Sequence, residues 1–234
     1  MDQRFEGLRS EPVQLELWEH GFPGVLATFC GLDGSGKTTT IEGLRAYVES
    51  CGRRVHVLRM PSNAARNLDY FREWADDHRA GEDGRVDVAA LFSVLLGDRL
   101  LTVRKTVLPL LAKGDWVICD RYLYTAFAQL AAIGCTEEDR GMLAAIASRF
   151  PRPDLPFVMD VRADEAIRRI RLRPEERDTK ADTDIFARFM DGYRRVAELN
   201  GVHLLPTRAL EETAELVRTI CAPYLERKLA TVAD

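Results

Sequence analysis

Short apolar runs alternate along the chain with longer segments in which apolar residues recur every three or four positions. Short runs of this kind are typical of buried strands, and the longer periodic segments are typical of helices that bury one face. The pattern predicts strands at residues 25–30, 55–60, 116–120, 155–160 and 202–205. It predicts helices at residues 38–50, 64–79, 86–112, 124–133 and 185–199, with further helices that begin near residues 136, 163 and 210. Strands that alternate with helices predict an α/β fold, with a five-stranded parallel sheet flanked by helices.

One domain is expected, because a chain of 234 residues can bury one substantial core. Gly52, Gly114 and Gly201 mark turns between predicted helices and the strands that follow them. Residues 24–234 are assigned to this domain. Residues 1–23 precede the first strand and are assigned as an N-terminal extension without a function, with a short helix expected near residues 13–19.

Composition and charge narrow the range of partners. The chain has 33 Lys and Arg residues against 37 Asp and Glu residues, so we expect no nucleic acid polymer as a partner. The most apolar segment, residues 86–111, contains charged residues and is expected to be a buried helix rather than a membrane span. The first residues lack the basic start and the apolar stretch of a secretory signal, so we expect none. Its five cysteines lack the paired spacing of a metal site, and we expect a cytoplasmic protein.

The segment from Gly31 to Thr38, GLDGSGKT, satisfies the phosphate-loop pattern between a predicted strand and a predicted helix. Its glycines allow backbone N–H groups to face phosphates at the helix N-terminus. Lys37 would reach the β- and γ-phosphates of ATP, and the Thr38 hydroxyl would bind Mg²⁺. The alternative is a glycine-rich turn that only caps a helix. The residues expected to bind the nucleotide are Gly31, Gly34, Ser35, Gly36, Lys37, Thr38 and Thr39.

Other classes of phosphate-loop protein lack support in the sequence. A regulatory GTPase would need an Asn-Lys-x-Asp segment to bind guanine, and the chain has none. The Gly-rich signature of transporter-type ATPases is also missing. Kinases of nucleotides and other small molecules remain.

Asp120 and Arg121 lie where the predicted strand at residues 116–120 ends. Open α/β sheets bind ligands at the carboxyl ends of their strands. Asp120 would therefore orient the Mg²⁺ shell, and Arg121 would bridge donor and acceptor phosphates during transfer. The alternative is that Asp120 caps the next helix and Arg121 is a solvated neighbour.

Several motifs occur together in a fixed order from residue 25 onward. They are GLDGSGKTT, Arg59-Met60-Pro61, Leu91-Phe92, Asp98-Arg99, Asp120-Arg121-Tyr122, Pro153-Asp154-Leu155, Met159-Asp160-Val161 and an arginine-rich segment near Arg173. In these motifs the chain resembles the thymidylate kinase family, which transfers a phosphoryl group from ATP to dTMP. The resemblance implies a P-loop nucleoside monophosphate kinase domain at residues 24–234, with ATP and Mg²⁺. It also implies a homodimer that forms through the helix at residues 86–111.

The resemblance implies roles for individual residues. Asp33 matches a carboxylate near the metal and the 3′-hydroxyl of the acceptor sugar, and it is also placed among the nucleotide-binding residues. Arg59 matches the arginine that holds the acceptor phosphate, and Arg99 the arginine that reaches the pyrimidine. Arg121 and Tyr122 match acceptor-binding positions of the Asp-Arg-Tyr segment. The alternatives are turn chemistry for Asp33 and an intrahelical ion pair for Arg99.

The basic run at residues 168–177 is expected to form part of a lid at about residues 171–184. Pro174 should end the preceding helix, so that Arg173 and Arg177 flank the break. The phosphate loop contains no arginine, and the resemblance therefore implies the type of enzyme whose catalytic arginine lies in the lid. Arg168 and Arg169 are expected to pair with acids on the same helix.

The expected base pocket departs from the family pattern. Leu95 stands where the family often has a stacking phenylalanine, and Gln129 stands where it commonly has a tyrosine linked to exclusion of a 2′-hydroxyl. Leu130 follows where the family commonly has a glutamine. We take dTMP as the first candidate acceptor, with dUMP or a modified pyrimidine monophosphate as the second. A nucleoside kinase and a catalytically silent nucleotide-binding module are further alternatives. The presence of Arg59 favours an acceptor that carries its own phosphate.

The expected reaction is direct in-line transfer without a covalent intermediate. An acceptor phosphate oxygen is already anionic near neutral pH, so no general base is required. Catalysis then depends on positioning and on charge neutralisation by Mg²⁺, Lys37, Arg121 and a lid arginine, either Arg173 or Arg177.

Overall fold

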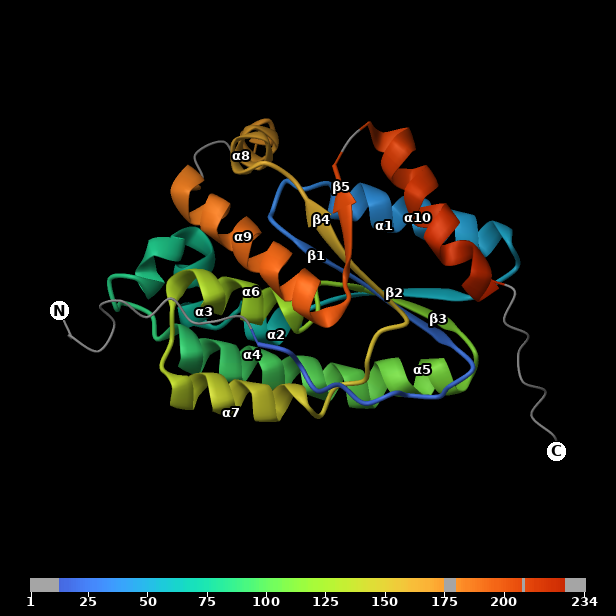
Figure 1. The fold of residues 1–234 in the computed structure, drawn as a ribbon, viewed down its shortest axis with the longest axis horizontal. Coiled ribbons are helices and arrows are strands. Elements are labelled where there is room, and N and C mark those ends of the chain that lie inside the picture. Colours follow the sequence, from blue (N-terminus) through green and yellow to red (C-terminus); the bar gives the residue numbers. More distant parts are fainter. Residues whose placement is uncertain (1–12, 175–179, 208, 226–234) are drawn as a thin grey trace.

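The computed structural model describes residues 13–174, 180–207 and 209–225. Within them, five parallel strands form one sheet in the order β2-β3-β1-β4-β5 (Figure 1). The strands are β1 (Val25–Gly31), β2 (Val55–Arg59), β3 (Trp116–Asp120), β4 (Leu155–Asp160) and β5 (His203–Pro206). This arrangement confirms the predicted parallel α/β sheet and places each strand within two residues of its predicted bounds.

The register of the central strands brings the candidate residues to one edge. Phe29 of β1 lies opposite Asp120 of β3, and Asp120 lies opposite Arg59 of β2. The ends of β2 and β3 are therefore level with Phe29, two residues before Gly31, at which the phosphate loop begins. The carboxyl edge of the sheet is where open α/β folds bind ligands.

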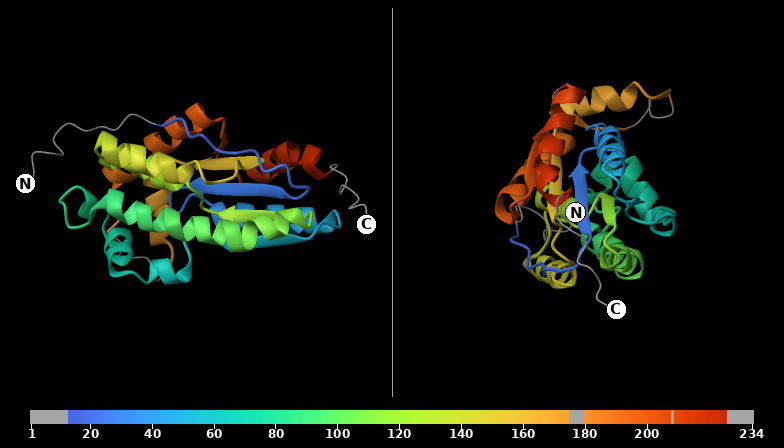
Figure 2. Two further views of the ribbon diagram at one scale, coloured as in Figure 1. Left: turned by 90° about the horizontal axis from the view of Figure 1, so that it is seen from below. Right: turned by 90° about the vertical axis from the view of Figure 1, so that its right-hand side faces the viewer.

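Helices cover both faces of the sheet (Figures 1 and 2). One face packs against α1 (Lys37–Ser50) and α10 (Leu210–Leu225). The other packs mainly against α4 (Val88–Thr102), α6 (Tyr124–Ile133) and α9 (Thr183–Asn200). Alternate residues of β1 belong to the two cores, since Ala27 and Phe29 face α1 whereas Leu26 and Cys30 face the opposite side. The remaining longer helices are α7 (Glu137–Ala147) and α8 (Ala163–Arg171).

Two predicted helices are divided in the structure. The segment predicted at 64–79 forms α2 (Asn63–Arg66), α3 (Asp69–Asp76) and a 3₁₀ turn, His78–Gly81. Asp77 ends α3 because its backbone is extended, and its carboxylate then accepts a hydrogen bond from the Arg79 N–H. The segment predicted at 86–112 is continuous, but a π-helical turn, Val103–Val107, separates α4 from α5 (Leu108–Ala112). The turn precedes Pro109, which has no N–H to donate.

The helix expected near residues 13–19 is absent from the structure, and this prediction is wrong. The segment is extended, and Trp18 forms a single β-bridge with Pro151. Leu15 and Leu17 are both buried, so the burial pattern has the two-residue period of an extended chain. Asn200 holds the segment in place, because its side-chain oxygen accepts a hydrogen bond of 2.7 Å from the Leu15 N–H.

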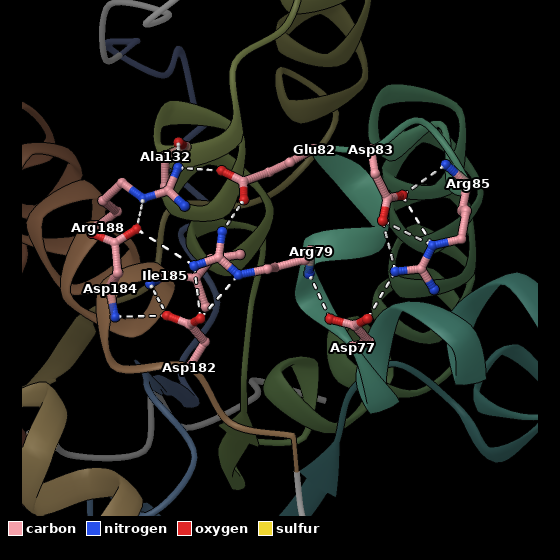
Figure 3. Close-up of polar contacts among 10 residues, drawn as sticks. All are labelled: Asp77, Arg79, Glu82, Asp83, Arg85, Ala132, Asp182, Asp184, Ile185 and Arg188. Atoms are coloured by element: carbon pink, nitrogen blue, oxygen red, sulfur yellow. Dashed lines mark hydrogen bonds and ion pairs between the residues drawn. The ribbon is translucent and has the colours of Figure 1, made fainter. Parts of the chain in front are cut away.

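Arginine ion pairs join the turn after α3 to the start of α9 (Figure 3). Asp182 caps α9 by accepting a hydrogen bond from the backbone N–H of Asp184, and it also accepts one of 2.7 Å from Arg79 Nη2. Glu82 forms ion pairs both with Arg79 and with Arg188 of α9. The beginning of α9, where the expected lid ends, is therefore fixed to the segment that contains His78.

Among the residues described, no helix has both the length and the apolar character needed to cross a lipid bilayer.

Candidate active site

The phosphate loop connects β1 to α1 and leaves the start of that helix open. Gly34 and Gly36 have φ angles of 77° and 89°, which favour glycine. A Cβ atom on Gly34 would also lie 2.2 Å from the carbonyl oxygen of Ala166. No side chain caps α1, so its first backbone N–H groups are available to an anion.

Lys37 is buried beneath this loop. Its ammonium group donates hydrogen bonds to the carbonyl oxygens of Gly31, at 3.2 Å, and Leu32, at 2.6 Å. Burial and the neighbouring charge of Arg121 lower the pKa of Lys37 to about 8. The ammonium group is thus mostly charged at neutral pH, but its pKa lies only slightly above neutral pH.

Two connected hollows surround the phosphate loop. The phosphate-loop pocket is lined by Asp33, Gly34, Ser35, Gly36, Lys37, Thr38, Thr39, Arg59, Asp120, Arg121 and Arg173. It includes every predicted nucleotide-binding residue except Gly31, whose carbonyl oxygen instead accepts hydrogen bonds from Lys37 and Arg121. A second hollow, the outer groove, continues from it and is lined by Gly34, Gly36, Thr39, Thr40, Arg169, Leu172, Arg173, Thr207, Leu210 and Thr213.

A third hollow, the inner pocket, adjoins the phosphate-loop pocket and shares no lining residue with the outer groove. It is lined by Asp33, Arg59, Met60, Pro61, Arg66, Phe71, Trp74, Ala75, His78, Phe92, Leu95, Arg99, Arg121, Thr125, Ala126 and Gln129. Asp33, Arg59 and Arg121 line both the inner pocket and the phosphate-loop pocket. The two hollows therefore meet at one carboxylate and two guanidinium groups.

Arg121 has a strained backbone at this junction. Its φ of 69° makes it the non-glycine residue with a left-handed conformation among those described. A hydrogen bond of 2.8 Å from its N–H to the carbonyl oxygen of Phe29 holds this conformation, and the side chain pairs with Asp33. Strain of this kind is maintained where surrounding contacts fix the conformation, and it is frequent at functional sites.

The ion pair shifts the pKa of both partners. For Arg121, burial favours the neutral form, but the charge of Asp33 outweighs it and raises the pKa above its usual value. For Asp33, removal from water would raise the pKa, but Arg121 and Lys37 lower it well below its usual range. Both groups are therefore charged throughout the physiological pH range.

Asp120 has the features expected of a residue that helps to hold Mg²⁺. Its Oδ1 atom is buried without a hydrogen-bond partner, and its Oδ2 atom lies 3.9 Å from Nε of Arg59. Thr38 lines the same pocket. The described residues include no cluster of three or more His, Cys, Asp or Glu side chains that would hold a metal alone. Mg²⁺ commonly takes one or two protein ligands and completes its shell with water and phosphate oxygens, so this site suits it.

Arg99 is 2% exposed in the inner pocket, and its Nε and Nη1 atoms have no hydrogen-bond partner. Burial lowers the pKa of Arg99 to about 10, so the side chain remains charged at neutral pH. The intrahelical ion pair considered as an alternative is therefore not formed. A buried guanidinium without a partner is costly, and this cost favours a ligand that accepts its hydrogen bonds.

Aromatic side chains line the inner pocket near Leu95, the residue in place of the expected phenylalanine. Trp74 and Phe92 pack edge to face with ring centres 5.8 Å apart, and Phe71 lies in the same lining. Leu95 and Gln129 also line this pocket. The pocket thus has an aromatic surface, but Phe71, Trp74 and Phe92 supply it in place of a residue at position 95.

Tyr122 is placed differently from its prediction. Its side chain is completely buried, and its hydroxyl donates a hydrogen bond of 2.9 Å to the carbonyl oxygen of Pro151. The ring also packs edge to face against Phe150. The predicted substrate contact of the Tyr122 side chain is therefore corrected to a role in packing. Because the backbone of Arg121 is left-handed, the side chains of Arg121 and Tyr122 point in different directions.

Sequence reasoning missed several residues of the inner pocket. Arg66, Phe71, Trp74 and His78 belong to none of the sequence motifs. His78 packs against Trp74 with ring centres 4.7 Å apart, and burial lowers its pKa to about 4, so the ring is neutral at pH 7. These side chains converge only because the segment after β2 folds into short helices, which periodicity did not resolve.

The expected lid is described in part. Helix α8 ends before Pro174, as predicted, and Arg173 lines both the phosphate-loop pocket and the outer groove. Arg169 pairs with Glu165 of the same helix, as expected, but Arg168 also pairs with Glu165 rather than with the expected Asp164, which pairs with Arg162. Arg177 lies outside the described residues.

The pKa of Lys37 leads to a prediction about nucleotide affinity. Phosphate binding requires the ammonium form, so ATP affinity should fall as the pH rises through about 8, by at most about tenfold per pH unit. Calorimetric titration with ATP between about pH 7 and pH 9.5 measures this dependence. The matched control is Lys37→Arg, whose guanidinium stays charged and should abolish the fall. Constant affinity of the unaltered protein up to about pH 9.5 would contradict the lowered pKa.

Comparison with known proteins gives a consistent result. The family model for thymidylate kinase matches residues 29–220. The chain is 31% identical over 221 residues to a thymidylate kinase of Bifidobacterium longum subsp. infantis, which covers 89% of this chain and 91% of that protein. It is 32% identical over 176 residues to a probable thymidylate kinase of Pyrococcus abyssi, in an alignment that covers 75% of this chain and 84% of that protein.

The family match includes the phosphate loop, the junction of the two pockets and the described part of the lid. Motifs that are far apart in the sequence thus meet at one edge of the sheet, within a region that matches a single family. The chain belongs to the thymidylate kinase family.

Proposed function

We propose that this chain transfers the γ-phosphoryl group of ATP to dTMP, with ADP and dTDP as products. The observation that carries the proposal is the junction formed by Asp33, Arg59 and Arg121, which line both the phosphate-loop pocket and the inner pocket. Phosphoryl transfer requires a donor and an acceptor to meet in line at a cationic site. The two hollows provide a place for each substrate on either side of that site.

The donor binds in the phosphate-loop pocket and the outer groove. Backbone N–H groups at the start of α1 and the ammonium group of Lys37 hold the ATP phosphates. The outer groove extends from the same glycines toward Thr207 and Leu210, where the rest of the nucleotide is accommodated. Thr38 and Asp120 would hold Mg²⁺, which neutralises phosphate charge when it is bound.

The acceptor binds in the inner pocket with its phosphate toward the junction. The unpaired guanidinium of Arg99 suits a carbonyl oxygen of a pyrimidine. Trp74 and Phe92 provide aromatic faces for the base, and Gln129 supplies an amide. Asp33 lies at the boundary and is placed to accept a hydrogen bond from the sugar.

The reaction is a direct in-line transfer. An anionic phosphate oxygen of dTMP forms a bond to the γ-phosphorus, and the bond from that phosphorus to the bridging oxygen of ADP breaks. Arg121 lies between the two pockets and stabilises the charge on the transferred group. The acceptor oxygen needs no general base because it is already ionised. The protein therefore contributes position and positive charge.

An assay of acceptors tests the proposal. ADP release from ATP and Mg²⁺ should be fastest, in kcat/KM, with dTMP in a panel that also contains dUMP, UMP, dCMP, dGMP and thymidine. Thymidine lacks the phosphate that Arg59 and Arg121 would bind, so it should not support turnover. If the enzyme preferred another monophosphate or a nucleoside, that compound would be assigned as the acceptor in place of dTMP. ATP binding without transfer to any acceptor would indicate a catalytically silent module.

Arg173 is the described lid arginine that lines the phosphate-loop pocket. Arg173→Ala should lower kcat by about a hundredfold or more, because the transferred group loses a cation. Arg171→Ala is the matched control, since Arg171 is exposed in the last turn of α8. Both variants should keep the free energy of unfolding of the parent. Unchanged kcat in Arg173→Ala would remove this residue from the mechanism and leave Arg177 as the lid candidate.

The homodimer expected from the family resemblance is supported by an exposed apolar stripe on α4. Val94 and Leu101 are 53% and 52% exposed, two turns apart on this helix. Sedimentation of the pure protein at micromolar concentration should give a dimer, and the double variant Val94→Glu, Leu101→Glu should give a monomer. A monomeric parent protein would contradict the proposal.

A cytoplasmic location is also proposed. The five cysteines are all free thiols, as is usual in a reducing compartment.

A further inference from the structure

We propose that His78 donates a hydrogen bond to the sugar hydroxyl of the acceptor and binds this hydroxyl together with Asp33. The inference rests on the proposed function, because it concerns the acceptor in the same inner pocket. His78 belongs to none of the sequence motifs, and it lines the inner pocket together with Asp33.

Aromatic side chains from two helices hold the ring of His78 in place. Its centre lies 4.7 Å from that of Trp74 in α3 and 5.2 Å from that of Phe189 in α9, which it meets edge to face. The ring of Phe186, also in α9, lies 6.0 Å away. Packing from both helices limits rotation of the imidazole, so its position is set before a ligand binds.

Ion pairs anchor the backbone on both sides of His78 (Figure 3). Asp77, the preceding residue, accepts a hydrogen bond of 2.7 Å from Arg85 Nη2. Arg79, the following residue, donates a hydrogen bond of 2.7 Å to Asp182 at the start of α9. These contacts fix the turn that carries the His78 ring at the wall of the inner pocket.

The chemistry of the ring suits an uncharged polar ligand. Burial lowers the pKa of His78 to about 4, so the imidazole is neutral near pH 7 and has one N–H donor. Its Nδ1 atom is buried without a hydrogen-bond partner among the described residues, which leaves Nε2 as the nitrogen that can meet a ligand. A phenylalanine would supply the same aromatic packing without an unpaired polar atom. The polar ring at this position therefore indicates a polar contact in the pocket.

His78 and Asp33 offer complementary groups to one hydroxyl. The ionised carboxylate of Asp33 can only accept a hydrogen bond, so a hydroxyl that donates to it keeps its oxygen lone pairs free to accept one from His78 Nε2–H. The two side chains are close enough for each to act on the pKa of the other. Asp33 also lies at the junction of the two hollows, between the place of the base and that of the phosphate. The sugar occupies this position, and its single hydroxyl in dTMP is the 3′-hydroxyl.

Calorimetric binding of dTMP and of its 3′-deoxy analogue to the full chain tests this contact. His78→Phe keeps the aromatic packing and removes the N–H, so dTMP should bind roughly 3- to 10-fold more weakly, the usual effect of losing one neutral hydrogen bond. The 3′-deoxy analogue should bind this variant within about twofold of the parent, because it lacks the hydroxyl in both cases. His78→Gln keeps an N–H donor and should bind dTMP with intermediate affinity.

The matched control is His203→Phe. His203 is an exposed histidine of β5 that lines none of the three hollows. This variant should bind both ligands with the affinity of the parent.

The outcomes distinguish this inference from the proposed function. Equal weakening of both ligands in His78→Phe would indicate a role in packing or a contact with the base, and unchanged dTMP binding would show that His78 makes no contact with the sugar. Either result would overturn the inference while the parent protein still phosphorylated dTMP. If the parent protein instead used a different monophosphate, the proposed acceptor would be wrong, and that nucleotide with and without its 3′-hydroxyl would still test His78.

Discussion

The ion pair between Arg121 and Asp33 is the contact on which the arrangement of the site depends. It joins the end of β3 to the phosphate loop, and Arg121 also donates a hydrogen bond to the Gly31 carbonyl oxygen. The left-handed backbone of Arg121 directs the side chain to this position while it turns Tyr122 into the core. The phosphate-loop pocket and the inner pocket share this pair, so a group that passes between the two hollows must pass beside it. The cost of the strained backbone is offset by the hydrogen bonds that hold it.

The lining of the inner pocket differs from the pattern expected of the family. Leu95 occupies a position where stacking was expected, yet Phe71, Trp74 and Phe92 supply aromatic surface from α3 and α4. The segment that carries Trp74 is stabilised from outside, because Arg79 connects the following turn to the cap of α9. The rearranged wall of the pocket and the end of the lid thus depend on the same group of ion pairs (Figure 3).

Much of the fold could be predicted because the sheet leaves a direct signal in the sequence. Each buried strand is a short apolar run, and the strand order of a parallel sheet brings the phosphate loop, Arg59 and Asp120 to one edge. The phosphate-loop residues carry their own spacing pattern. The segment between β2 and α4 could not be predicted in this way, because its helices are short and their ends depend on tertiary contacts such as that of Ser62 with Asp98. The directions of Tyr122 and Arg66 likewise depend on local backbone geometry that residue identity does not specify.

The central claim is that the two pockets place a nucleotide donor and a pyrimidine monophosphate acceptor on opposite sides of Arg121. A crystal structure with dTMP, Mg²⁺ and a non-hydrolysable ATP analogue tests it most directly. The account predicts the pyrimidine against Arg99 and the acceptor phosphate beside Arg59 and Arg121, in line with the γ-phosphate. An acceptor bound outside the inner pocket, or one whose phosphate lies away from Arg121, would contradict it.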